Sequence, residues 1–157
     1  MLIHNIKLPV QNDLLRVRER FLIMCLPYYI GKSEEEFKKV FIQKSVECSD
    51  DHALTSEEMQ QLEKHKLPDT IAAKCFMACV FKKVNWLNSS GMFDINAANA
   101  MVEKEHVDDS EKIEISKKLF QMCKKVNEET VSDNAKGCER SEHLFKCLTE
   151  NAPQVNT

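Results

Sequence analysis

The chain has 157 residues, a length that fits one domain with a short extension better than two domains. Only three glycines and four prolines are present, so the tight turns and left-handed backbone positions that β-rich folds need are scarce. The glycines also stand too far apart for the phosphate-binding loops of Rossmann and P-loop enzymes, which are excluded. Hydrophobic residues make up 43% and charged residues 30%, a balance typical of globular proteins and not of disordered or membrane-spanning ones.

The net charge of −3 conceals a difference between the two ends of the chain. Residues 1–32 carry five basic and two acidic side chains, whereas the remaining 125 residues carry 17 basic and 23 acidic ones. An acidic domain without a basic stripe repels phosphate backbones, so the sequence predicts no nucleic-acid partner.

Residues 1–32 have the pattern of a secretory leader. Three arginines between positions 16 and 20 precede a ten-residue apolar run at 21–30, which is too short to cross a bilayer but fits a signal-peptide core. Gly31 and Ser33 are small residues that suit cleavage after Ser33. We therefore expect a signal-peptide-like leader at 1–32 and a secreted domain at 33–157. The alternative is a misassigned start or a retained N-terminal helix.

From residue 33 onward, capping residues and apolar stripes predict about six short helices and no strand. The sequences Ser33 to Glu36, Thr55 to Glu58 and Asp108 to Glu111 have the form of capping boxes. The helix expected from Asp69 to about Trp86 is apolar on nearly all sides, so it should lie at the centre of the domain. The expected helix starts are Ser33, Thr55, Asp69, Asp94, Asp108 and Asp133.

The chain has seven cysteines, and Cys25 lies within the apolar run of the leader. The other six cysteines predict three disulfides in a secreted domain. Six cysteines can pair in 15 different ways. Cys75 and Cys79 lie four apart on one helix and cannot bond to each other, and Cys138 and Cys147 face opposite sides of another. About ten pairings remain open. The alternative is a reduced intracellular protein; a zinc site is disfavoured because the close pair lies in an apolar helix.

The six cysteines have the spacing C-x26-C-x3-C-x43-C-x14-C-x8-C. This spacing resembles that of the insect odorant-binding and pheromone-binding protein family, over residues 33 to about 150. The resemblance implies a compact all-α bundle of about six short helices around a central hydrophobic cavity. It also implies three interlocked disulfides, which join Cys48 to Cys79, Cys75 to Cys138, and Cys123 to Cys147.

The resemblance further implies a secreted carrier of small hydrophobic molecules such as odorants or pheromones. No cofactor is expected, and the motifs and cysteine spacing predict neither a metal site nor enzymatic activity. Candidate partners are a small hydrophobic ligand, an odorant receptor and a second copy in a homodimer; no membrane partner is expected. Methionine and aromatic side chains suit the wall of an adaptable pocket. The ligand-binding residues that we expect are Phe41, Met59, Leu62, Met77, Phe81, Trp86, Phe93, Met101, Leu119, Phe120, Met122 and Phe145.

His106 is the candidate for a pH gate, because histidine titrates near neutral pH and this residue lies between Glu105 and Asp108 after a predicted helix. The alternative is a solvated loop histidine. No catalytic motif of the G-x-S-x-G or H-E-x-x-H type is present, and Asn99 replaces the glycine that an EF-hand loop would need. Asn88-Ser89-Ser90 is an acceptor sequence for N-glycosylation. The competing class of function is a secreted helical protein that binds another protein and no small molecule.

Overall fold

The computed structural model describes residues 32–64 and 66–152, and this part of the chain folds into six α-helices. They are α2 (Lys32–Ser49), α3 (Ser56–Glu63), α4 (Ile71–Lys83), α5 (Ile95–Glu105), α6 (Ser110–Cys123) and α7 (Cys138–Asn151). Two short 3-10 helices, η1 (Lys124–Glu128) and η2 (Asn134–Lys136), lie between α6 and α7. Extended pairing within the described ranges is limited to an isolated bridge between Leu87 and Phe93. The predicted all-α fold is confirmed. Residues 1–31, which include Cys25 and all but the last residue of the expected leader, lie outside the described residues.

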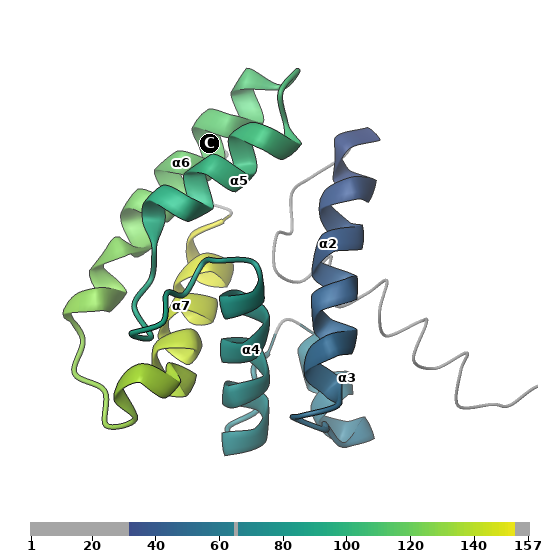
Figure 1. Cartoon of the computed structure of the whole chain (residues 1–157), viewed down its shortest axis with the longest axis vertical. Coiled ribbons are helices and arrows are strands. Elements are labelled where there is room, and N and C mark those ends of the chain that lie inside the picture. The colour runs from purple at the N-terminus through teal and green to yellow at the C-terminus, as the bar shows by residue number, and fades with distance from the viewer. Residues whose placement is uncertain (1–31, 65, 153–157) are drawn as a thin grey trace, which may run out of the picture.

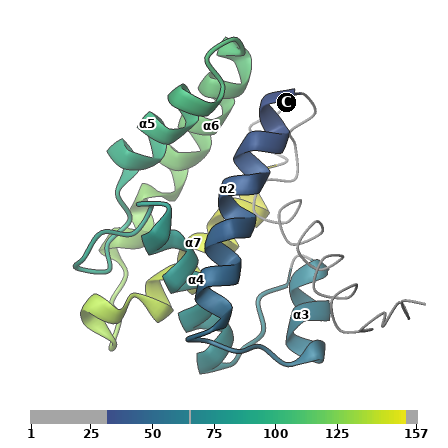
Figure 2. The same cartoon turned by 45° about the vertical axis from the view of Figure 1, so that its right-hand side comes forward.

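Helices α4 and α7 pack side by side at the centre and form the most extensive contact between helices (Figure 1). Helix α2 packs against α4 on one side, and the hairpin of α5 and α6 contacts α7 through α6. Turning the molecule shows α3 beside the lower end of α2, away from the α5 and α6 hairpin (Figure 2). The predicted central position of the helix expected from Asp69 is confirmed for α4, although α4 ends at Lys83 and not near Trp86. Asn85, with a φ of 62°, turns the chain after it.

Two of the predicted helix starts are confirmed. Thr55 and Glu58 form a reciprocal capping box at α3, in which Glu58 N–H donates to Thr55 Oγ1 (3.2 Å) and Thr55 N–H donates to Glu58 Oε2 (2.8 Å). Asp94 caps α5 by accepting from Ala97 N–H at 3.0 Å. These bonds satisfy backbone donors that the first turn of a helix leaves without intrahelical partners.

Two other starts are wrong by one residue. Thr70, not Asp69, caps α4 and accepts from Ala73 N–H at 3.2 Å, while the Asp69 carboxylate pairs with Lys74 Nζ at 2.6 Å. Asp109, not Asp108, caps α6. In both places adjacent residues are able to cap, and the folded chain decides which one takes the position. The first described helix begins at Lys32, one residue before the expected cap at Ser33.

The last helix begins at Cys138 and not after Asp133, because η2 and the left-handed Gly137 (φ 75°) intervene. Asp133, which lies before the helix, still accepts hydrogen bonds from the first backbone N–H groups of α7. Its Oδ2 accepts from Cys138 N–H (2.6 Å) and Glu139 N–H (3.1 Å). A carboxylate is favourable there because the first turn of a helix presents unpaired N–H groups and a partial positive charge.

Candidate functional site: a disulfide-braced aromatic interior

Three disulfides join four of the helices. Cys48–Cys79 links α2 to α4, Cys75–Cys138 links α4 to α7, and Cys123–Cys147 links α6 to α7. The structure therefore has the pairing that the family resemblance implied. The two cysteines of α4 bond to different neighbours, as expected from helix geometry. Because the bridges interlock, the central helices are held together by covalent bonds as well as by side-chain packing.

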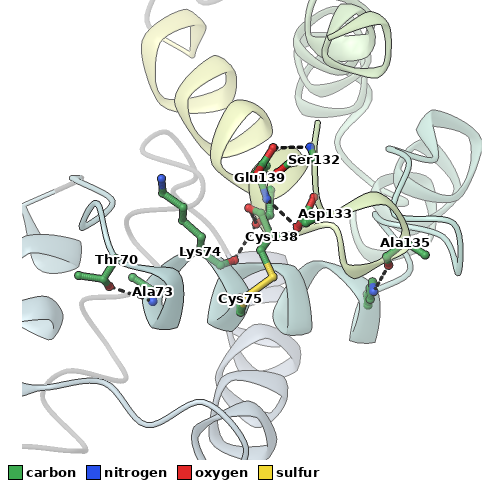
Figure 3. The surroundings of a disulfide bond; sticks show 11 residues. Thr70, Ala73, Lys74, Cys75, Ser132, Asp133, Ala135, Cys138 and Glu139 are labelled. Carbon is green, nitrogen blue, oxygen red and sulfur yellow. Dashed lines mark hydrogen bonds between the residues drawn. A yellow bond between two sulfur atoms is a disulfide. The ribbon is translucent and has the colours of Figure 1, made fainter. Parts of the chain in front are cut away.

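The seam between α4 and α7 is also closed by polar contacts around Cys75–Cys138 (Figure 3). Ser141 Oγ contacts the carbonyl oxygen of Lys74 at 2.8 Å, and Lys74 Nζ lies 2.9 Å from Glu142 Oε2. Desolvation of Glu142 opposes ionisation, yet hydrogen bonds from Lys146 and Lys74 leave its pKa lowered from 4.5. This seam is thus fixed by one covalent bond and by a charge network that is only partly exposed.

Trp86 lies at the centre of an aromatic cluster formed by three helices. Its ring centroid is 5.3 Å from that of Phe41 on α2, 5.8 Å from that of Phe81 on α4, and 5.1 Å from that of Phe120 on α6. Phe93 extends the cluster, with its centroid 6.1 Å from that of Phe120. Edge-to-face and stacked rings at such distances are favourable beyond the area they bury. The rings provide an apolar interior, and residues far apart in sequence meet there.

The structure brings most of the predicted ligand-binding residues to this interior. Nine are buried and two are half-buried, whereas Met122 is 39% exposed. The expectation that Met122 points inward is wrong, because it follows the buried Phe120 by two positions, about 200° around the helix. The buried ones are Phe41, Leu62, Met77, Phe81, Trp86, Phe93, Leu119, Phe120 and Phe145, and the half-buried ones are Met59 and Met101.

Some buried residues of the core were not among the predicted site residues. Leu144 and Leu148 on α7 are buried in the same cluster. They lie four residues apart, on the same apolar face of the helix as Phe145, and this spacing could have predicted their burial. Arg140 is 4% exposed, and its Nη1 donates to the carbonyl oxygens of Val126 and Glu129, thereby fixing η1 against α7. The sequence carries no signal for this burial, because arginine is seldom buried.

His106 is buried, with 2% of its surface exposed, at the C-terminal end of α5. Its backbone N–H donates to the Val102 carbonyl oxygen (3.0 Å), and its own carbonyl oxygen accepts from Asp109 N–H (2.9 Å). The alternative of a solvated loop histidine is therefore wrong. The pKa of Asp109 is lowered, chiefly by the backbone N–H of Lys112, and further by the Lys112 side chain and the charge of His106.

The described part of the chain offers neither a metal site nor a membrane span. Residues 32–64 and 66–152 bring together no three His, Cys, Asp or Glu side chains able to hold a metal ion. None of the helices in these ranges combines the length and the apolar character required to cross a bilayer.

Six helices tied by three interlocked disulfides around an aromatic interior define a class of small all-α domains. Residues 31–151 match the model of the PBP/GOBP family, and the chain belongs to this family. This match confirms the family that the cysteine spacing indicated, the insect odorant-binding and pheromone-binding proteins.

Relatives and a solved structure agree with this assignment. General odorant-binding protein 19d of Drosophila melanogaster is 29% identical over 129 residues, covering 82% of this chain and 83% of the relative. General odorant-binding protein 28a of the same species is 25% identical over 119 residues, covering 76% and 80%. The solved structure of Odorant-binding protein dmelOBP28a from Drosophila melanogaster superposes with a TM-score of 0.61 at 23% identity, covering 80% of this chain and 98% of that one. This superposition supports the fold.

Proposed function

We propose that the protein is a secreted carrier that binds small hydrophobic molecules, such as odorants or pheromones, and transports them through aqueous fluid to receptors. The observation that carries the proposal is the aromatic cluster around Trp86, enclosed by helices that disulfides hold in place. A covalently braced frame allows helices to enclose a ligand without filling the whole interior with side chains. The names of the relatives, which are odorant-binding proteins, support the same function.

The ligand site proposed is this interior, with Met77 and Met101 as adaptable parts of its wall beside the rings. Methionine is flexible and polarisable, so it adjusts to ligands of different shape. Burial of a chain of 10 to 12 carbons contributes about 8–10 kcal/mol before the cost of association is subtracted, at ~0.8 kcal/mol per methylene. Dissociation constants in the micromolar range are expected.

Release of the ligand is proposed to depend on His106. Protonation would place a positive charge at a position that is 2% exposed, and burying a charge is costly unless it is compensated. Asp109 is a counter-charge close to this position, although the Lys112 contacts contribute more than His106 to the lowering of its pKa. The other ionisable residues beside this turn are Lys104, Glu105, Asp108, Glu111 and Lys112. Acidification to about pH 5 is therefore expected to loosen the turn between α5 and α6 and weaken ligand binding.

Secretion is proposed to follow from the leader at residues 1–32, with the mature domain beginning near residue 33. Sequencing the N-terminus of the protein recovered from the medium of expressing cells tests this step, because an intact Met1 would contradict cleavage. An odorant receptor and a second copy of the chain remain the proposed macromolecular partners. Light scattering of the purified protein measures whether the homodimer forms.

The carrier function is tested by the fluorescence of Trp86, which is the only tryptophan of the chain. Titration with long-chain alcohols or esters should shift or quench its emission, since it lies within the proposed site. The same compounds should displace a fluorescent hydrophobic probe. If micromolar protein shows neither an emission change nor probe displacement, the carrier function is contradicted. That result would favour the alternative of a protein that acts through protein contacts alone.

A further inference from the structure

The turn between α4 and α5 carries Asn88-Ser89-Ser90, the one Asn-X-Ser/Thr tripeptide of the chain. All three side chains are exposed. The next residue, Gly91, is buried and has a φ of 73°. A Cβ atom at Gly91 would lie 2.6 Å from the Asn134 carbonyl oxygen, so this end of the turn packs tightly against the η2 segment. The tripeptide therefore projects into solvent from a turn that is anchored on its other side.

The amide of Asn88 is held by its oxygen. Asn88 Oδ1 accepts from the backbone N–H groups of Ser90 (2.9 Å) and Met92 (3.1 Å). The backbone of Asn88 is fixed as well, with its N–H donating to the Met92 carbonyl oxygen at 2.9 Å and its carbonyl oxygen accepting from Gly91 N–H at 3.0 Å. The fold thus uses the oxygen of the side-chain amide and leaves Nδ2 on an exposed residue.

Asn127 provides a contrast within the same region. Its Oδ1 accepts from Phe93 N–H at 2.8 Å, and its Nδ2 donates to the Phe93 carbonyl oxygen at 2.9 Å. Substitution on that nitrogen would place a bulky group beside a donor that holds the segment before α5. The amide of Asn88 can lose one Nδ2 hydrogen without losing either of its hydrogen bonds.

We propose that Asn88 is an N-glycosylation site. In this reaction Nδ2 forms a bond to the anomeric carbon of an oligosaccharide carried on a lipid pyrophosphate. The bond between that carbon and the pyrophosphate oxygen breaks, the lipid pyrophosphate leaves, and one Nδ2 proton is released. The product keeps the amide carbonyl and one N–H, so both bonds to Oδ1 persist in the glycosylated fold. The proposal rests on the secretory route of the proposed function, because the donor occurs in that compartment.

The glycan would lie away from the proposed gate. Asn88 precedes α5 and His106 follows it, and a helix of 11 residues is about 16 Å long at ~1.5 Å per residue. A glycan at Asn88 would keep the α4 to α5 turn out of protein contacts and leave the α5 to α6 turn accessible. Ligand exchange at the gate and glycosylation are therefore compatible.

The test is expression of the full chain in insect cells behind a host secretion leader, followed by intact-mass analysis. Asn88→Asp keeps the acceptor oxygens but removes the acceptor nitrogen, and Ser90→Ala removes the recognised hydroxyl. Ser89→Ala is the matched control, since it changes the neighbouring serine and preserves the acceptor sequence. Wild type and Ser89→Ala should carry one glycan that peptide N-glycosidase removes with conversion of Asn88 to Asp. Both other variants should have the mass of the bare polypeptide.

Wild-type protein with an unmodified Asn88, either in the medium or in the secretory compartments of the cells, would overturn the proposal. Failure of the carrier function is a separate outcome. A glycosylated protein that takes up no hydrophobic probe would contradict the carrier function and leave the assignment of Asn88 intact.

Discussion

The hydroxyl of Thr70 donates a hydrogen bond to the carboxylate of Glu58 and so connects the starts of two helices. Glu58 closes the capping box of α3 through Thr55 N–H, and Thr70 caps α4 through Ala73 N–H. One buried carboxylate therefore supports both helix starts, although the two residues are 12 positions apart. This relation fixes α3 to the beginning of the central helix.

Replacing Thr70 by alanine should destabilise the protein by about 1–2 kcal/mol, because the N-cap and the bond to Glu58 are lost together. The measurement is chemical unfolding followed by circular dichroism. Thr130→Ala is the control, since this threonine is exposed and lies outside the helices. Equal stability of the two variants would show that the link between α3 and α4 contributes nothing.

The same carboxylate should make stability depend on acid. The pKa of Glu58 is lowered from 4.5, first by the Thr70 hydroxyl and then by Thr55 N–H, while burial acts in the opposite direction. A folded-state pKa below the unfolded one means that the unfolded chain binds more protons in this range. The contribution of Glu58 is therefore present above pH 4.5 and is lost as the pH falls through the lowered pKa.

Unfolding midpoints measured from about pH 6 down to about pH 3 should fall more steeply for wild type than for Glu58→Gln. Glu57→Gln, at the exposed neighbouring position, should retain the wild-type slope. Parallel curves for wild type and Glu58→Gln would contradict a role for this carboxylate in acid stability.

Local sequence signals predicted which helices form better than they predicted the exact residue at which each helix begins. Thr55 was identified as a cap because Glu58 follows it by three positions in a capping box, and Asp94 because it precedes an apolar stripe at helical spacing. Asp69 was predicted because it follows Pro68, and Asp108 because Glu111 follows it by three positions; in both places the next residue, Thr70 or Asp109, is the cap, since packing selects between adjacent capping residues. Similarly, the start of the last helix depends on the left-handed Gly137, whose conformation the sequence pattern did not specify.

The disulfide pairing and the burial of the site residues depend on contacts between residues far apart in the sequence. Helix geometry left about ten disulfide pairings open, and only the family resemblance selected the one in the structure. The burial of His106 was not predicted, because flanking charged residues are typical of a solvated loop. Met122 was misplaced because it follows Leu119 by three positions and so fits the apolar stripe of its helix, yet it lies on the exposed edge of that stripe.

Removal of the disulfides should destabilise the protein in the order of the loops that they close. Cys75–Cys138 spans a sequence separation of 63, and Cys123–Cys147 spans 24. A loop-entropy estimate gives about 4.3 kcal/mol for the first and about 3.4 kcal/mol for the second. Denaturant unfolding of the paired cysteine-to-serine variants measures both losses. A larger loss for the shorter loop would show that packing around the bridges outweighs chain entropy.

Two methionines provide a paired test of the proposed pocket. Met77 is fully buried beside the aromatic cluster, whereas Met122 is 39% exposed on α6. Met77→Ala should weaken binding of a hydrophobic probe by up to roughly fiftyfold, since the three methylene-sized groups that it removes contribute about 2.4 kcal/mol. Met122→Ala should leave the affinity unchanged. Equal effects in the two variants would place the probe elsewhere, and unfolding curves measured in parallel distinguish lost affinity from lost stability.

The last prediction concerns His106. Wild-type affinity for a fluorescent hydrophobic probe should fall by roughly tenfold between about pH 7 and about pH 5, equivalent to about 1.4 kcal/mol. His106→Ala should bind the probe with the same affinity at both pH values, because the buried position can no longer acquire a charge.

His143→Ala is the matched control for this experiment. His143 lies on α7, is partly exposed, and has Nδ1 2.7 Å from Glu129 Oε2, so it is a surface histidine outside the turn that holds His106. This variant should keep the wild-type pH dependence of probe binding. An unchanged pH dependence in His106→Ala would assign the response to other groups and exclude the proposed gate.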